Sequence, residues 1–304
     1  MLISGSSKYQ INQRMTNYYL TKPLFKAVLW CCIYYILLTI IQTITIIVFG
    51  LNINQVKAGK IQLSVHLLTS LISCIGTYMY FLYFNKKYNC GNFKLTFYLK
   101  DFTLFIYGSA LGLIAITVIF FFVYILGHTR VSFNNGYSLI AGIEASALFL
   151  LVAITEEIFN RAIILNYLLR SNYGRNYAII ISSLIFTIFH SMNPNLGLVG
   201  SITIFLSGII LATLFIHCNY NIWMSIGLHW TWNFFQSIYG FAVSGLSVPS
   251  VLKQDFLKDD LINGGSFGLE GSVITVIILL ISIKVLYIFY NRYSAKSTQN
   301  TLGI

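Results

Sequence analysis

Residues 138–167 read SLIAGIEASALFLLVAITEEIFNRAIILNY, and the class of fold follows from them. The run is longer than the roughly 20 apolar residues that an α-helix needs to cross the hydrocarbon core of a bilayer. Five polar or charged residues fall within the short segment 155–161, which follows the apolar block 147–154 and precedes the shorter block 162–165. This pattern predicts a transmembrane helix that holds a polar group of side chains inside the membrane.

Apolar runs of similar length recur through the 304-residue chain, of which 57% is hydrophobic and only 9% charged. A soluble domain carries about 25% charged residues, so this composition excludes an ordinary water-facing surface. We predict an all-α, polytopic bundle of about eight transmembrane helices, forming a single membrane-embedded domain over residues 1–304. The predicted spans cover approximately residues 28–49, 63–84, 102–127, 138–167, 177–192, 196–217, 222–243 and 272–291.

The net charge of +11 comes from Lys and Arg residues placed between the apolar runs, so we expect no nucleic-acid partner. More of these cations lie in connections on the side of the N-terminus than on the opposite side. Because cytoplasmic connections are enriched in Lys and Arg, both termini are predicted to be cytoplasmic. The 244–271 connection would then lie outside, and its acids are expected to form a solvated face. These acids are Asp255, Asp259, Asp260 and Glu270.

The fourth predicted span contains three ionisable residues close together, Glu156, Glu157 and Arg161. Each would cost about 2.5–3.5 kcal/mol at the bilayer centre, so they must face one another or a polar cavity. In an α-helix, Glu157 and Arg161 lie on one face in the order that favours an ion pair. Glu156 lies about 100° around the axis, so it is predicted to remain available to other groups. The alternative is a charged patch that joins helices without performing a reaction.

Two later spans contribute further polar side chains. His190 follows Phe186 by one turn at the end of the fifth span, and His229 precedes Asn233 by one turn in the seventh. Together with Glu156 they supply a base, two imidazoles and an amide. Such a set can activate a water molecule against a carbonyl group. We therefore predict a hydrolytic site shared by three spans.

Two other features are interpreted as structural. His66 and His217 lie near span ends without polar neighbours of this kind, so no direct role is expected for either. Gly108 and Gly112 form a GxxxG pattern in the third span, which favours close packing against another helix.

The ordered set of motifs resembles the CPBP family of intramembrane proteases, which includes CAAX-processing and bacteriocin-processing enzymes. The family pattern is EExxxR, then FxxxH, then HxxxN or HxxxD, each in a separate membrane helix. This chain carries the pattern without a departure at Glu156, Glu157, Arg161, Phe186, His190, His229 and Asn233. The resemblance covers about residues 138–291, the expected motif core, and implies a membrane metalloendopeptidase of the CAAX type.

The resemblance also implies a role for each signature residue. Glu156 would act as the general base that polarises the attacking water, and His190 would help to hold that water or a metal carrying it. His229 and Asn233 would stabilise the oxyanion.

Glu157 and Arg161 would hold the other signature residues in place. The resemblance further implies zinc or another divalent metal. Its ligands would be Glu156, His190, His229 and Asn233. The chain lacks an HExxH motif, and a metal-free water activated by Glu156 would use the same side chains, so both versions stay open.

We therefore predict an intramembrane endopeptidase whose partners are membrane lipid and a membrane-associated peptide. By analogy, the substrates would be prenylated, CAAX-like C-terminal peptides or bacteriocin and leader peptides. The abundance of Ile, Asn, Tyr and Lys is typical of AT-rich bacterial genomes, so a bacterial cell membrane is the expected location. Two alternatives stay open. One is a catalytically inactive scaffold or bacteriocin self-immunity protein, and the other is an ion- or proton-coupled transporter.

Overall fold

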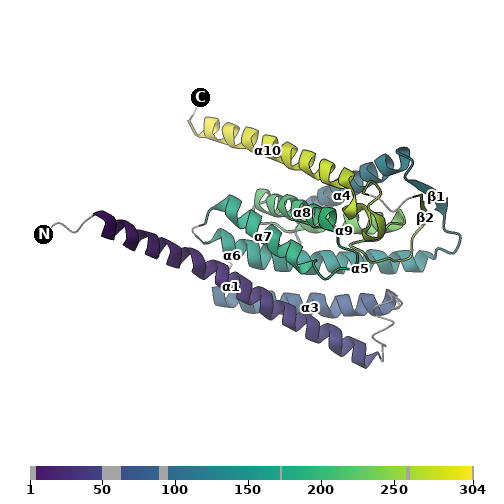
Figure 1. The fold of residues 1–304 in the computed structure, drawn as a ribbon, viewed down its shortest axis with the longest axis horizontal. Coiled ribbons are helices and arrows are strands. Elements are labelled where there is room, and N and C mark those ends of the chain that lie inside the picture. Colours follow the sequence, from purple (N-terminus) through teal and green to yellow (C-terminus); the bar gives the residue numbers. More distant parts are fainter. Residues whose placement is uncertain (1–4, 50–62, 89–94, 172, 258–260, 303–304) are drawn as a thin grey trace.

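The computed structural model is a helical bundle with one small sheet (Figure 1). The described residues are 5–49, 63–88, 95–171, 173–257 and 261–302. The helices are α1 (Gly5–Val48), α3 (Leu63–Tyr88), α4 (Leu99–Ile125), α5 (Leu139–Glu157), a π-helix (Ile158–Leu165), α6 (Asn166–Leu169), α7 (Arg175–Phe189), α8 (Leu198–His217), α9 (Trp223–Ile238) and α10 (Val273–Leu302). The all-α fold class predicted from the sequence is confirmed.

Each predicted span coincides with one helical segment, because every long apolar run can satisfy its backbone hydrogen bonds only within a helix. Among the described residues, five segments are long and apolar enough to cross a membrane: Pro23–Thr45, Leu63–Tyr88, Leu99–Ile125, Leu139–Leu169 and Leu198–His217. Two shorter apolar helices are Arg175–Phe189 and Val273–Ile288. The chain is therefore a helical membrane protein, and the total of eight crossings stays a prediction.

Local boundaries differ from the expected ones. α1 begins upstream of the predicted start and continues through Pro23, because proline fixes φ near the helical value and removes only one backbone donor. α7 ends at Phe189 and α9 at Ile238, both a few residues early. A two-stranded antiparallel sheet was not predicted. It pairs β1 (Thr129–Phe133) with β2 (Leu252–Phe256) and joins two connections that are far apart in sequence.

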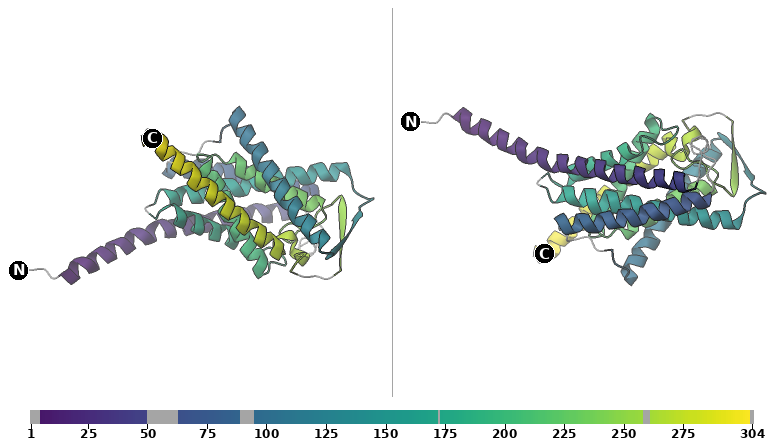
Figure 2. Two further views of the ribbon diagram at one scale, coloured as in Figure 1. Left: turned by 90° about the horizontal axis from the view of Figure 1, so that it is seen from above. Right: turned by 90° about the horizontal axis from the view of Figure 1, so that it is seen from below.

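The helices form layers around α5, α8 and α9. α9 packs against α4 and α5, α8 against α7 and α10, and α3 against α1 and α5. α1 and α10 lie on opposite outer sides of the bundle (Figures 1 and 2). The N-terminal end of α1 and the C-terminal end of α10 lie at the same end of the bundle (Figure 1). That both termini lie on the cytoplasmic side of a membrane stays a prediction.

The bundle exposes apolar side chains on its outer helices and buries polar ones in its centre. Ile44, Met79, Phe121 and Ile281 are exposed on α1, α3, α4 and α10. Lipid tails would cover such side chains, whereas ionisable groups within a membrane face the interior of a bundle. The buried charged residues of the fourth span follow this rule.

The GxxxG pattern of α4 lies against α9. A Cβ atom at Gly108 would lie 2.0 Å from the carbonyl oxygen of Met224, and one at Gly112 would lie 2.4 Å from that of Leu228. A side chain at either position would therefore force the two helices apart. This close contact sets the position of α9 and, with it, the position of His229.

Candidate active site

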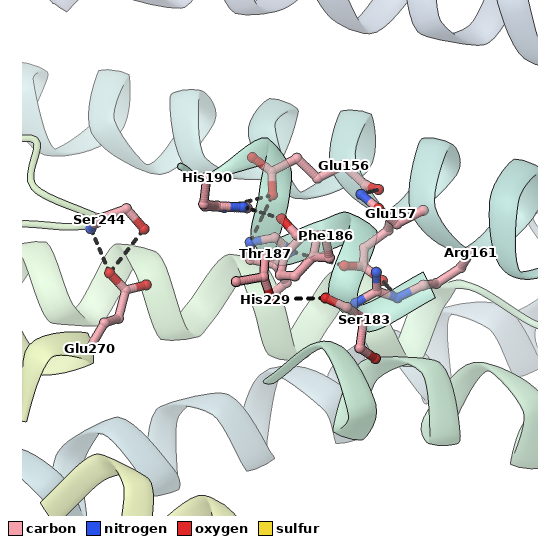
Figure 3. Close-up of polar contacts among 11 residues, drawn as sticks. Glu156, Glu157, Arg161, Ser183, Phe186, Thr187, His190, His229, Ser244 and Glu270 are labelled. Atoms are coloured by element: carbon pink, nitrogen blue, oxygen red, sulfur yellow. Dashed lines mark hydrogen bonds and ion pairs between the residues drawn. The ribbon is translucent and has the colours of Figure 1, made fainter. Parts of the chain in front are cut away.

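Three helical segments meet around Glu156 (Figure 3). Glu156 is the penultimate residue of α5, just before the backbone changes to the π-helix Ile158–Leu165. His190 is the first residue after α7, and His229 and Asn233 lie one turn apart on α9. The polar side chains that the sequence assigned to separate spans are therefore brought to one place.

Glu157 links Arg161 to His229. Its Oε2 atom lies 3.0 Å from Arg161 Nε, and its Oε1 atom lies 3.0 Å from His229 Nδ1. Glu157 and Arg161 are both fully buried. The predicted ion pair is present, whereas the link to His229 was not predicted. Because an ionised carboxylate only accepts hydrogen bonds, this link orients the imidazole and places a proton on Nδ1.

The Arg161 guanidinium is stabilised by an aromatic ring as well as by Glu157. Its Cζ atom lies 4.8 Å from the centre of the Phe186 ring, a cation–π contact. Such a contact contributes about 0.5–2 kcal/mol. The 3.0 Å contact with Glu157 lacks the alignment of a hydrogen bond, and the guanidinium nitrogens have no hydrogen-bond partner among the described residues. Glu157 and Phe186 thus both stabilise this buried cation by direct contact.

His190 is oriented by the backbone one turn before it. Its Nδ1 atom lies 2.8 Å from the carbonyl oxygen of Phe186. A carbonyl oxygen only accepts, so Nδ1 carries the proton and the neutral imidazole has its lone pair on Nε2. The spacing of the FxxxH motif therefore determines the tautomer of its histidine.

Three electron-pair donors face one another across a short gap. Glu156 Oε2 lies 3.6 Å from His190 Nε2 and 3.8 Å from His229 Nε2 (Figure 3). Both distances are too long for a hydrogen bond, and Glu156 Oε2 has no hydrogen-bond partner among the described residues. A water molecule or a cation between these atoms would interact with all three.

The chemical types of these three donor atoms suit a divalent metal. Imidazole nitrogens oriented through Nδ1, together with a carboxylate oxygen, are common zinc ligands. Tetrahedral ligands about 2.1 Å from zinc stand roughly 3.4 Å apart, close to the separations found here. Within the described ranges, however, no group of three or more His, Cys, Asp or Glu side chains is close enough to form a preformed metal site. The metal therefore stays a prediction.

A cavity of about 1360 Å³ lies beside these atoms. Its lining includes Glu156, His190, His229 and Asn233. Glu157 and Arg161 are not part of the lining and support it from behind. His66, for which no role was expected, also lines the cavity. The volume exceeds the roughly 300–1,000 Å³ of most small-molecule pockets, so a peptide segment could enter.

Residues 139–235 match the family model of type II CAAX prenyl endopeptidase Rce1-like proteins. This segment is therefore similar to the CAAX proteases, the group that its motifs resemble. The match covers about a third of the chain and contains every signature residue. A comparison with curated proteins finds no match. The family match and the apolar helices together support a membrane-embedded endopeptidase.

The CPBP signature begins where α5 changes to the π-helix. The sequence predicted a regular α-helix through residue 167, and the structure instead contains the wider π-helical turns over Ile158–Leu165. π-helical turns occur frequently at functional sites. Here Asn160, which is 3% exposed, donates a hydrogen bond from Nδ2 to the carbonyl oxygen of Glu156 at 2.9 Å and lines the cavity. Its position among the unspecified letters of EExxxR hid this role from sequence analysis.

One carboxylate in the cavity lies outside the CPBP signature and outside the matched segment. Glu270, in the 3₁₀ turn Leu269–Gly271, is only 8% exposed and lines the same cavity as Glu156. The expected solvated face is therefore wrong for this residue, because the glycine-rich stretch around it turns back into the bundle. Gly264 and Gly268 adopt positive φ angles there, which side chains rarely allow. Those glycines were the available sequence signal.

The other acids of this connection have different outcomes. Asp255 is exposed, as expected, and Asp259 and Asp260 lie outside the described residues. Burial raises the pKa of Glu270. Hydrogen bonds from Ser244 oppose that rise, because they favour the ionised carboxylate.

Proposed function

We propose that the chain is an intramembrane endopeptidase that hydrolyses a peptide bond in the cavity beside Glu156. The observation that carries this proposal is the position of Glu156 Oε2, which lies within 4 Å of two oriented imidazoles and has no protein hydrogen-bond donor among the described residues. A water molecule bound at this point would lie next to a base and beside a space large enough for a peptide.

In the proposed reaction, Glu156 takes a proton from the water while the water oxygen attacks the scissile carbonyl carbon. The lone pair of His190 Nε2 accepts the other hydrogen of that water and so orients it. The carbonyl becomes an oxyanion, and Glu156 then returns its proton to the nitrogen of the departing amine. The carbon–nitrogen bond breaks, and a carboxylic acid and an amine are released.

His229 and Asn233 stabilise the oxyanion in this scheme. The Asn233 amide donates one hydrogen bond from the cavity wall. In its protonated form, His229 donates a second from Nε2, and the Glu157 carboxylate beneath Nδ1 stabilises the imidazolium. Arg161 pairs with Glu157, which in turn contacts His229, so Arg161 acts as a positioning residue without touching the substrate.

Zinc or another divalent metal would be held by Glu156, His190 and His229, with Asn233 as the weaker fourth donor. When bound, such an ion would lower the pKa of the attacking water. Both versions of the reaction use the same four side chains, and the metal content of an active preparation distinguishes them.

The substrates proposed are membrane-associated peptides, either prenylated CAAX-like C-termini or bacteriocin and leader peptides, in a bacterial cell membrane. The apolar outer faces and the cavity beside the fourth span support a substrate that arrives from the lipid. An inactive scaffold or self-immunity protein, or a transporter, would keep the polar cluster without cleaving anything.

The Glu156→Gln variant tests the proposal. Glutamine keeps the shape of the side chain and cannot accept the proton, so we expect proteolysis of a membrane-anchored reporter to fall at least about 100-fold. Glu144→Gln is the control, because Glu144 lies on the same helix and does not line the cavity. The two variants are compared at equal membrane levels. Unchanged cleavage by Glu156→Gln, or no cleavage by the unmodified chain, would reject the enzyme.

A further inference from the structure

The cavity beside Glu156 is lined by acidic side chains when its carboxyl groups are ionised. Its lining contains two carboxylates, Glu156 and Glu270, and no Lys or Arg among the described residues. Arg161 is not part of the lining and pairs with Glu157 behind it. A substrate that brings a positive charge would therefore be favoured, and one that brings a carboxylate would be repelled.

Glu270 is held rigidly at the wall of the cavity. Its Oε2 atom accepts a hydrogen bond from the Ser244 backbone N–H at 2.6 Å and another from Ser244 Oγ at 2.9 Å. Ser244 has a φ of 49°, a left-handed conformation that is uncommon for serine. Both hydrogen bonds reach the same oxygen, and Oε1 has no protein donor among the described residues. Figure 3 shows Oε1 on the side that faces the two histidines.

The charge of Glu270 acts on the reaction centre. Glu270 lines the same cavity as His190 and His229, so a group bound at Glu270 would lie in the space proposed to hold the scissile bond. Burial alone opposes ionisation of this carboxyl group. A cationic ligand would add a positive charge to the two hydrogen bonds from Ser244 and would thereby favour the ionised form.

A second residue of the cavity lining, Asn160, also has a hydrogen-bond acceptor without a partner among the described residues. Asn160 uses its Nδ2 to bond the Glu156 carbonyl, and its buried Oδ1 atom is left without a donor among the described residues. When both carboxyl groups are ionised, Asn160 Oδ1, Glu156 Oε2 and Glu270 Oε1 accept hydrogen bonds and cannot donate them. Ammonium and guanidinium groups, which only donate, are their chemical complement.

We propose that this cavity selects peptides that carry a basic side chain close to the scissile bond, and that Glu270 is the specificity-determining residue that binds this side chain. The proposal rests on the endopeptidase function above and narrows its substrate class. It also disfavours a free C-terminal carboxylate next to the cleaved bond. A peptide bond inside a basic segment fits the cavity better.

Binding measurements test the proposal without requiring turnover. The full chain is placed in nanodiscs of zwitterionic lipid. Its affinity is measured for fluorescent, uncleavable N-methyl-amide peptides of otherwise neutral sequence. In each peptide one residue is Lys, norleucine or Glu, and the position of that residue is varied on both sides of the N-methylated bond. At the best position we expect Lys to bind about tenfold tighter than norleucine, and Glu to bind more weakly than either.

Variants separate charge recognition from support of the loop. Glu270→Gln removes the charge and should abolish the preference for Lys while leaving norleucine affinity within about twofold. Ser244→Ala keeps the carboxylate and should keep the preference, and Asp255→Asn, an exposed acid in the same connection, should change nothing. Equal binding of Lys and norleucine peptides to the unmodified chain would overturn the proposal. So would an equal loss of both in Glu270→Gln, since that pattern indicates a structural role.

Cleavage of the corresponding unmethylated peptides is measured in parallel. Efficient cleavage without a preference for Lys rejects the role of Glu270 and retains the endopeptidase. A preference for Lys that depends on Glu270, without cleavage of any peptide, supports the basic-peptide site and rejects the endopeptidase.

Discussion

Replacing Arg161 by Met would leave Glu157 as a buried carboxylate without its cation. Both residues are fully buried, and Arg161 Nε lies 3.0 Å from Glu157 Oε2. Methionine fills part of the same volume and keeps an apolar contact with Phe186, so the main change is the loss of the positive charge. The remaining partner of Glu157 is His229, through a 3.0 Å contact.

The magnitude follows from the burial of the pair. Removing one partner of a buried ion pair costs about 3–5 kcal/mol, and loss of the cation–π contact with Phe186 adds up to about 2 kcal/mol. Some of this is offset by the packing of Met. We expect Arg161→Met to lower the free energy of unfolding by about 3–5 kcal/mol. The double variant Glu157→Gln/Arg161→Met removes both charges and should lose less than the sum of the single variants by about 2 kcal/mol or more.

The assay is an SDS titration in mixed micelles, followed by tryptophan fluorescence, on four proteins: the unmodified chain, each single variant and the double variant. The decisive quantity is the coupling energy of the double-mutant cycle. A coupling below about 0.5 kcal/mol, or an Arg161→Met variant as stable as the unmodified chain, would show that the pair does not act as inferred.

Three further measurements address the helix contact, the buried acid and the metal. Gly108→Ala would place a Cβ atom 2.0 Å from the Met224 carbonyl oxygen, so we expect the free energy of unfolding to fall by about 1–3 kcal/mol and activity to decrease. The control is Gly197→Ala, where nothing lies within 4 Å of the added Cβ atom and the change should stay within about 0.5 kcal/mol. Equal effects of the two variants would contradict the close α4–α9 contact. Because the pKa of Glu270 is raised on folding, its contribution to stability is present at low pH and is lost as pH rises from about 4.3 through the folded-state pKa. The free energy of unfolding, measured over a pH series, should therefore fall across this range. The Glu270→Gln variant should not show this decrease. We expect a purified, active preparation to hold about one equivalent of a divalent metal per chain and to lose activity on chelation. An active sample without bound metal would contradict the metal-dependent form of the reaction.

The helical membrane architecture could be predicted from the sequence because lipid leaves few choices. An apolar run of about 20 residues must satisfy its own backbone hydrogen bonds, and so the predicted spans reappear as helices. The Glu157–Arg161 ion pair was also predictable, since residues four apart in a helical segment lie together whatever surrounds them. The ends of α7 and α9, the π-helix and the β1–β2 pair were not predictable, because each depends on contacts with distant segments.

Local periodicity also explains which parts of the site could be found. Glu156, His190 and His229 belong to short sequence motifs, each contained within a few residues. These motifs could therefore be assigned to the correct helical segments from the sequence. Whether these side chains converge depends on the packing of α5, α7 and α9, to which Gly108 and Gly112 contribute from α4.

Glu270 shows the difference most directly. By composition it belongs to a polar connection with other acids, and its neighbours in sequence predict solvent. Its burial and its place in the cavity arise from a turn that folds back between helices and from Ser244, 26 residues away in the chain. Short-range spacing along one helix is encoded within a few residues, and so the chain itself specified the helices and the ion pair. The charge of a cavity is a sum over segments that meet only on folding, and for that reason it became visible only once the helices were packed together.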